Sequence, residues 1–223
     1  MKSNRGFHTH LLHIVVCIAS NLIGYMNCST FALPALLSER NPSVSSPAGG
    51  NDHSVAPYLS PDGRYAVFCS SASDLVTNDN GRIHVDVFLR DCLGNRTELV
   101  SARYDGRGGG NDNSMCGVVS TNGRYVLFLS DASDLVQGDT NGLTDVFVRD
   151  MVLQTNILVS AGMHGASANG ATTDASMSPD GRYVVFVSTR RGKSELFTMN
   201  SDGSDQLPIE GIKGSSFTPH WSN

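Results

Sequence analysis

SPDGRYVVF (178–186) is the third copy of a stretch that recurs along the chain. SPDGRYAVF stands at 60–68 and STNGRYVLF at 120–128. A second short stretch follows each copy: DVFLRD at 86–91, DVFVRD at 145–150 and ELFTMN at 195–200. Repetition at this spacing is typical of stacked structural units, so the fold follows from the properties of one repeat.

The first repeat predicts four short strands joined by turns. Pro61 and Gly63 suit a tight turn between a strand near 54–60 and a strand near 64–71. Residues 65–69 are apolar at every position, which is typical of a strand that is buried on both faces. Residues 86–91 and 97–102 then supply the third and fourth strands.

A twisted sheet with two apolar faces is not stable alone. Copies stacked around a common axis bury both faces, which is the arrangement of a β-propeller. A β-sandwich would leave one polar face on each strand, and a solenoid would need shorter coils. The predicted fold class is therefore all-β: a β-propeller of four-stranded antiparallel blades, with three blades, partial strands at each end, and an incomplete ring.

The repeats also predict the domain organisation. Residues 1–29 are expected to be a secretory signal peptide, and residues 30–50 an outer strand of a preceding blade followed by a linker. The blades are expected at about 51–110, 111–168 and 169–212, with the start of another at 217–223. Three blades fall short of the usual four to eight, so we expect a fragment of a larger protein, with assembly with another copy as the alternative. An open ring would expose sheet edges and apolar faces, which favours self-association.

The N-terminus has the pattern of a secretory signal. Lys2 and Arg5 precede an apolar stretch at 11–26, which is short for a membrane span. Ordinary secretion is therefore favoured over a retained anchor, and we expect a secreted or periplasmic protein whose mature chain does not insert into a membrane. Residues 1–30 hold no Asp or Glu, so their removal leaves a chain more acidic than the net charge of −5. That balance argues against nucleic acid and anionic membranes as partners.

SPDGRYVVFVS (178–188), together with ELFTMNSDGSDQL (195–207), resembles the TolB-like, WD-repeat-like β-propeller family. The resemblance covers about residues 51–223, and residues 217–223 resemble the opening strand of another such blade. It implies a propeller fold. It leaves function open, because such propellers serve as binding platforms, as periplasmic transport components and as non-catalytic domains of peptidases. The second repeat departs from the pattern, with Thr121-Asn122 in place of Pro-Asp.

Acidic loops between the second and third strands could bind a metal. The candidate ligands are Asp134, Asp139, Asn141 and Asp145 in the second repeat, and Asp74, Asp79, Asn80 and Asp86 in the first. Ca²⁺ takes six to eight oxygen ligands of these kinds. The third repeat has TRRGK (189–193) instead, so the fold itself does not require the acids. However, the loops lack the EF-hand order, and Asp, Asn and Gly also form ordinary turns, so both interpretations stay open.

Catalytic motifs are absent from the sequence. There is no G-x-S-x-G elbow and no H-E-x-x-H pair, and the histidines fall in predicted loops. We therefore do not expect an enzyme. The cysteines of the mature chain are interpreted as small hydrophobic residues, with a Cys69–Cys116 bridge between neighbouring blades as the alternative.

These features together favour one function. We expect an extracytoplasmic, non-catalytic scaffold that binds a protein or peptide through loops on one rim, with calcium as the one possible cofactor. The alternatives are the accessory propeller of a larger hydrolase or peptidase, and a structural propeller stabilised by calcium.

Overall fold

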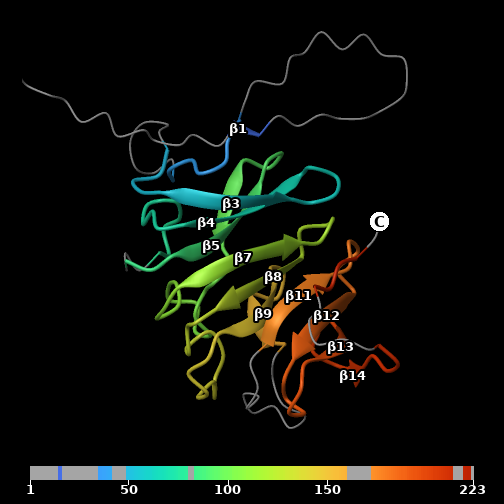
Figure 1. Ribbon diagram of the computed structural model, residues 1–223. Coiled ribbons are helices and arrows are strands. Elements are labelled where there is room, and N and C mark those ends of the chain that lie inside the picture. The colour runs from blue at the N-terminus through green and yellow to red at the C-terminus, as the bar shows by residue number, and fades with distance from the viewer. Residues whose placement is uncertain are drawn as a thin grey trace, which may run out of the picture.

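The computed structural model describes residues 15–16, 35–41, 49–79, 83–159, 172–212 and 218–221. Within these ranges the chain forms strands and turns and no helix, so no described segment is an apolar helix of membrane-spanning length. Figure 1 shows three sheets that follow one another along the molecule in chain order.

Each of the three sheets has four antiparallel strands arranged in their order along the chain, and we call the sheets blades 1, 2 and 3. Blade 1 consists of β3 (Ser54–Leu59), β4 (Tyr65–Ser70), β5 (Asp86–Asp91) and β6 (Arg96–Leu99). Blade 2 consists of β7 (Ser114–Val119), β8 (Tyr125–Ser130), β9 (Asp145–Asp150) and β10 (Thr155–Leu158). Blade 3 consists of β11 (Thr172–Met177), β12 (Tyr183–Ser188), β13 (Glu195–Asn200) and β14 (Leu207–Pro208). The sheets do not close on themselves, and the predicted all-β fold of four-stranded blades in an incomplete ring is confirmed.

The first two strands of each blade are joined by the same tight turn. Gly63, Gly123 and Gly181 have φ values of 72°, 69° and 73°, a conformation that glycine adopts without steric cost. In blade 1 the amide of Gly63 donates to the carbonyl of Ser60 at 2.8 Å, and the amide of Tyr65 donates to the Ser60 hydroxyl at 2.9 Å. The turn chemistry predicted from Ser-Pro-Asp-Gly is therefore present.

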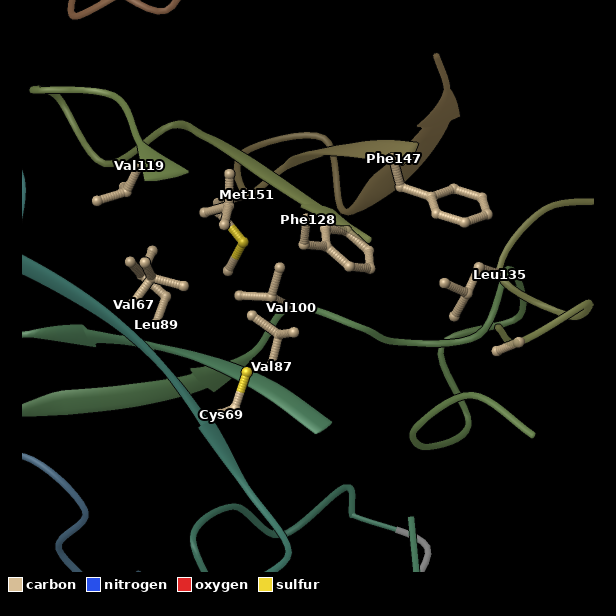
Figure 2. Close-up of a cluster of buried hydrophobic side chains, with 12 residues drawn as sticks. Val67, Cys69, Val87, Leu89, Val100, Val119, Phe128, Leu135, Phe147 and Met151 are labelled. Carbon is tan, nitrogen blue, oxygen red and sulfur yellow. The ribbon is translucent and has the colours of Figure 1, made fainter. Parts of the chain in front are cut away.

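An apolar core lies between each pair of neighbouring blades. Val67, Val87 and Val100 of blade 1 pack in one cluster with Phe128 and Phe147 of blade 2 (Figure 2). A second cluster joins the opposite face of blade 2 to blade 3, and it contains Leu127, Val146, Val148, Val159, Met177, Val184, Phe186, Phe197 and Met199. Both faces of the middle blade are thus buried, and this burial is the main force that holds the blades together.

Blade 3 covers its aromatic pair differently from blade 2. The rings of Phe128 and Phe147 are stacked with centroids 5.6 Å apart, and Ala132 and Leu135 from the loop at 131–144 join the same cluster. The corresponding loop of blade 3 is only residues 189–194. There the guanidinium carbon of Arg190 lies 5.0 Å from the ring centroid of Phe186 and 4.9 Å from that of Phe197. A cation–π contact therefore replaces aliphatic cover where the loop is short.

The two ends of the array are less regular. β1 (Val15–Val16) pairs with β2 (Ala35–Leu36), and Glu39 forms an isolated bridge with Gly49. The rest of the expected signal peptide lies outside the described residues. Residues 218–221 form no strand, but the Trp221 indole stacks on Tyr183 with centroids 6.3 Å apart.

One expectation about the cysteines is wrong. Cys69 is disulfide-bonded and 3% exposed, so it is not a free hydrophobic side chain. Its Sγ lies 4.0 Å from the carbonyl oxygen of Ser114, on the face of blade 1 that meets blade 2. The side chain of Cys116 lies outside the described residues. Cys92 is free and half-buried, and burial raises the pKa of its thiol.

Candidate functional site

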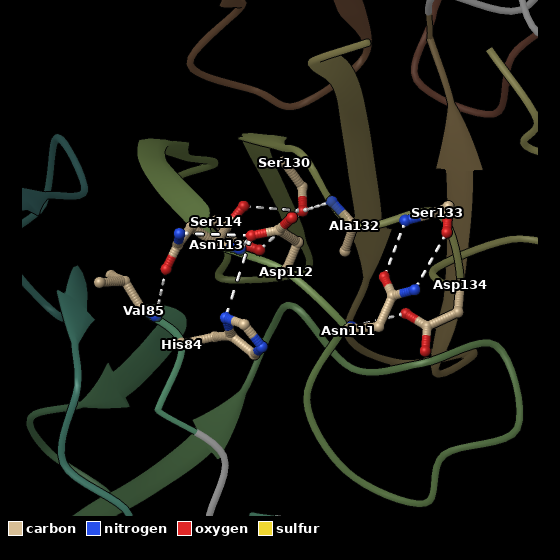
Figure 3. Close-up of polar contacts among 10 residues, drawn as sticks. All are labelled: His84, Val85, Asn111, Asp112, Asn113, Ser114, Ser130, Ala132, Ser133 and Asp134. Atoms are coloured by element: carbon tan, nitrogen blue, oxygen red, sulfur yellow. Dashed lines mark hydrogen bonds and ion pairs between the residues drawn. The ribbon is translucent and has the colours of Figure 1, made fainter. Parts of the chain in front are cut away.

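Two of the predicted calcium ligands hold neighbouring parts of the scaffold together. The carboxylate of Asp134 accepts the backbone amide of Asn111 at 2.9 Å and lies 3.4 Å from Nε of Arg103. We call these three residues the clasp; Figure 3 shows Asn111 and Asp134 beside Ser133, whose amide donates to the Asn111 side chain at 2.9 Å.

Blade 1 repeats the clasp. Asp74 accepts the amide of Asn51 at 2.9 Å and the side chain of Arg40. Each clasp joins the entry to a blade's first strand with the loop after its second strand. Asp74 and Asp134 are therefore engaged by an arginine and a backbone amide.

Asp86 and Asp145 start the third strands of blades 1 and 2 and are almost completely buried. Asp86 is 3% exposed and accepts the Ser101 hydroxyl at 2.6 Å. Asp145 is 1% exposed and accepts the Asn141 side-chain amide at 2.9 Å. Asp86 thus ties the third strand of blade 1 to the segment after its fourth strand, and Asp145 holds the loop that leads into its own strand.

The other predicted ligands are Asp139, Asp79 and Asn80. Asp139 is buried, with an exposed fraction of 8%, Asp79 is half-buried, and Asn80 lies outside the described residues. Among the described residues, no group of three or more His, Cys, Asp or Glu is placed to hold a metal ion. Calcium binding stays a prediction from the sequence. Its test is the melting temperature with Ca²⁺ and with a chelator, because a ligand bound only to the folded state raises that temperature.

A different candidate site lies at the turn ends of the blades. A cleft of about 450 Å³ is lined by Asp62, Arg64, Tyr65, Thr121, Asn122 and Asp180. Asp62, Asn122 and Asp180 hold the same position in the three repeats, so one cleft gathers a turn from every blade. The turns of blades 2 and 3 are fixed to each other, since the Thr121 amide donates to the carbonyl of Pro179 at 2.8 Å.

A second cleft, of about 240 Å³, is found at the turn ends of blades 2 and 3. Its lining residues are Tyr125, Gly181, Arg182, Tyr183, Asn200, Ser201 and Asp202. Gly181 directly follows Asp180, so the two clefts meet at one turn. We call the lining residues of both clefts the turn track.

The turn track carries ionised carboxylates. The Ser178 hydroxyl, followed by the amide of Arg182, lowers the pKa of Asp180 below its usual value. The Ser204 hydroxyl and amide do the same for Asp202. Arg64 is occupied by Asp91, with Nη2 2.8 Å from Oδ2, so its charge is matched. The track therefore has a surplus of negative charge.

Two histidines of the described part of the chain, His53 and His84, lie near a carboxylate. His84 Nδ1 lies 3.9 Å from Asp112 Oδ1 (Figure 3), and His53 lies 3.9 Å from the neighbouring Asp52. Both distances exceed a hydrogen bond. In the part of the chain that the structure describes, no catalytic constellation is evident.

The chain matches no model of a protein family. It is similar to the β-propeller domain of the Trilobed protease from Pyrococcus furiosus, at 10% identity and a TM-score of 0.47, over 73% of this chain and 43% of that one. It is also similar to a putative TolB from Agrobacterium tumefaciens, at 18% identity and a TM-score of 0.46, over 80% and 57%. A third similar structure is TolB from Acinetobacter baumannii, at 17% identity and a TM-score of 0.45, over 79% and 41%. The chain thus spans between 41% and 57% of the length of these three proteins.

The sequence contains a pairing of an arginine with an aspartate that could have predicted the clasp. Arg40 and Arg103 each follow a Ser-x pair, and each has its acid in a Ser-Asp pair, at Asp74 and Asp134. In the third repeat, Gly162 stands where the arginine would be and Gly192 where the acid would be. Because the arginine and the aspartate are absent together from the third repeat, we infer that these two side chains interact with each other. The turn track had no comparable signal, because its residues meet only when the blades stack.

Proposed function

We propose that this propeller is a non-catalytic, extracytoplasmic binding scaffold whose turn track holds an extended segment of another protein. The observation that carries the proposal is the track itself, which crosses three blades at one end. Tyrosine and arginine beside hydrogen-bonding groups are the residue types enriched in protein-binding surfaces. The track offers Tyr65, Tyr125 and Tyr183 in this setting.

The charge of the track selects the partner. Asp62, Asp180 and Asp202 outnumber Arg64 and Arg182, and Arg64 is already paired with Asp91. Complementary charge guides association and suppresses wrong partners. We therefore expect a segment that carries lysine or arginine.

An extracytoplasmic location has two independent supports. Lys2 and Arg5 precede the apolar stretch at 11–26, the order of a secretory signal. Cys69 is disulfide-bonded, and stable disulfides belong to oxidising compartments.

The test is selection of a random peptide library against the full chain, followed by affinity measurements on a selected peptide. We expect enriched peptides to contain lysine or arginine and to bind more weakly as salt rises. The double variant D62N/D180N should weaken binding by about three- to tenfold, since it removes two carboxylate charges. Asparagine is tolerated at this position, because Asn122 of blade 2 accepts the Ser120 hydroxyl at 2.8 Å and the Arg124 amide at 3.0 Å.

The matched control is Asp131→Asn. Asp131 directly follows β8 and lies at the opposite end of that strand from the turn, where it accepts the Thr144 hydroxyl at 2.5 Å. Loss of the Asp131 charge should leave the affinity for the peptide unchanged. Failure to enrich any peptide, or equal affinity for D62N/D180N and the unaltered chain, would contradict the proposed function.

A further inference from the structure

In blades 1 and 2 the arginine that follows the turn glycine covers the ring of the next tyrosine. In blade 1 the guanidinium carbon of Arg64 lies 4.8 Å from the ring centroid of Tyr65. Asp91 is opposite Tyr65 on the neighbouring strand, and it holds the guanidinium with Oδ2 2.8 Å from Nη2. Blade 2 repeats this arrangement, at 4.9 Å and 2.8 Å, with Arg124, Tyr125 and Asp150. We call these three positions of a blade the guanidinium site, because a guanidinium contacts both the ring and the carboxylate there.

Blade 3 has a guanidinium site without its aspartate. Asn200 is the residue opposite Tyr183, where blades 1 and 2 have an aspartate. Arg182 lies beside Asp180 instead, with Nε 3.7 Å from Oδ2, and its side chain is 77% exposed. Within the described residues, the guanidinium contacts with aromatic rings do not include Tyr183. The arginine of blade 3 therefore does not take the position that its counterparts occupy.

The guanidinium site of blade 3 opens into the smaller cleft of the turn track. Arg182, Tyr183 and Asn200 all line this cleft of about 240 Å³, and Tyr125 of blade 2 lines it as well. Two described blades thus form its walls. The place that an arginine fills in the other blades is part of a cleft here, and a side chain from outside can enter it.

Ser201 gives a second, independent sign of a ligand. It corresponds to Met151 of blade 2, because the amide of each donates to the carbonyl of the arginine in its own guanidinium site, at 2.9 Å and 2.7 Å. Met151 belongs to the core cluster that Tyr65 joins, whereas the shorter Ser201 lines the cleft together with Tyr125. Ser201 is 3% exposed, and its hydroxyl has no hydrogen-bond partner among the described residues. Because a buried hydroxyl without a partner is costly, a ligand that bonds to it would be stabilised.

The polar groups of the cleft favour a ligand that donates hydrogen bonds. Asn200 Nδ2 donates to Ser204 Oγ at 2.9 Å and to Asp205 Oδ2 at 2.8 Å, so its oxygen is the atom left to meet a ligand. Asp202 accepts the hydroxyl and the amide of Ser204, and no cation of the described chain contributes to its lowered pKa. A guanidinium fits these acceptors, because it is a cation with several N–H donors in one plane and it stacks on aromatic rings.

We propose that this cleft binds the guanidinium of an arginine side chain in the segment that the turn track holds. The guanidinium stacks on a tyrosine ring, as Arg64 and Arg124 do within their own blades, and it donates to the oxygens of Asn200, Ser201 and Asp202. This inference rests on the proposed binding of a segment, and it specifies which side chain of that segment is recognised.

The ligand is tested by isothermal titration calorimetry of the full chain with a selected peptide. Each basic residue of the peptide is replaced in turn by arginine, by lysine and by citrulline, which keeps the shape of arginine without its charge. At one position we expect arginine to bind about tenfold more tightly than lysine or citrulline, because only the guanidinium is both planar and charged. Equal affinities at every position would overturn the inference and leave the proposed function standing.

The cleft is tested with Asn200→Asp. This variant restores the aspartate of the other blades, so Arg182 should turn onto Tyr183 and fill the cleft from within the chain. An arginine tethered beside the site competes well with a peptide in solution. We therefore expect the arginine peptide to bind about tenfold more weakly, although the variant is more acidic. The matched control is Asn78→Asp, which adds the same charge at an exposed position in the loop after β4, and it should bind like the unaltered chain.

A double variant separates filling of the cleft from damage to the fold. N200D/R182Q keeps the new carboxylate and removes the guanidinium that would fill the cleft, so the arginine peptide should bind at least as tightly as it binds the unaltered chain. The inference is overturned if N200D binds this peptide as well as N78D does, or if R182Q does not restore binding. If no peptide binds the unaltered chain, the proposed function fails and this inference fails with it.

Discussion

Gly109 lies directly against the carboxylate of Asp86, so closely that a Cβ atom on the glycine would be 2.3 Å from Oδ2. The carboxylate is buried and accepts the Ser101 hydroxyl, and Gly109 forms an isolated bridge with Ala102, which follows the outer strand β6. A glycine at this position lets the entry to blade 2 pass over a buried charge of blade 1.

Gly109→Ala should therefore destabilise the protein. The methyl group would overlap a carboxylate that is buried and held by the Ser101 hydroxyl, and overpacking of this kind costs about 1 to 3 kcal/mol. The free energy of unfolding in urea measures the effect. In an Asp86→Ala background the cost of the same change should shrink, since the clashing atoms are gone. Equal costs in both backgrounds would show that Asp86 is not the cause.

Stability should fall with acid between about pH 4 and pH 2 through Asp91. The hydrogen bond from Arg64, offset by burial and helped by the amides of Gly94 and Leu93, lowers the pKa of Asp91 from 3.8 to about 2. A carboxyl with a lowered folded-state pKa contributes stability above its unfolded pKa and loses it as the pH falls through the folded value. Urea unfolding of Asp91→Asn from pH 2 to pH 6 should show a flatter acid limb. Arg64→Gln should flatten it too, because it removes the largest cause, and an unchanged slope in both variants would contradict the prediction.

Arg190→Ala should destabilise blade 3 by about 1 to 2 kcal/mol, because the change uncovers the Phe186 and Phe197 rings and removes a cation–π contact. Arg191→Ala is the matched control, since that side chain is 57% exposed and its loss should change stability by less than about 0.5 kcal/mol. Thermal unfolding compares the two. Equal melting temperatures for both variants would show that the stacking contributes nothing.

Reduction of the disulfide should lower the stability of the folded protein by about 2 to 4 kcal/mol, because the bond limits the unfolded chain. Cys69→Ser should reproduce the effect without reductant. Cys92→Ser should behave like the unaltered chain with and without reductant, since Cys92 is free. Peptide mapping under non-reducing conditions identifies the partner of Cys69. A melting temperature insensitive to reductant would rule out a stabilising bond.

The blades could be predicted from the sequence because each depends on local chemistry. Pro61 and Gly63 fix a turn by their own backbone preferences, and the glycines at 123 and 181 repeat it. The apolar run at 65–69 shows two buried faces without any knowledge of what covers them. The repetition of this pattern then predicts that the sheets pack against one another, because a sheet with two apolar faces needs a neighbour on each side.

The candidate site could not be predicted in the same way. Asp62, Asn122 and Asp180 lie far apart along the chain, and only the stacking of blades brings their turns into one cleft. The sequence predicts Asp74 and Asp134 as possible metal ligands, because an acidic residue in a loop gives the same pattern whether a metal ion or an arginine faces it. The role of Arg190 could not be predicted either, because a short basic loop gives no sign that its first arginine covers two aromatic rings.

Trp221 is the one tryptophan of the chain, and it stacks on Tyr183 while its indole donates to the carbonyl of Ser176 at 3.3 Å. Its fluorescence consequently reports on the third blade alone. Circular dichroism reports on all the strands together. A comparison of the two signals during unfolding therefore reveals whether the three blades unfold in one transition or blade 3 unfolds first.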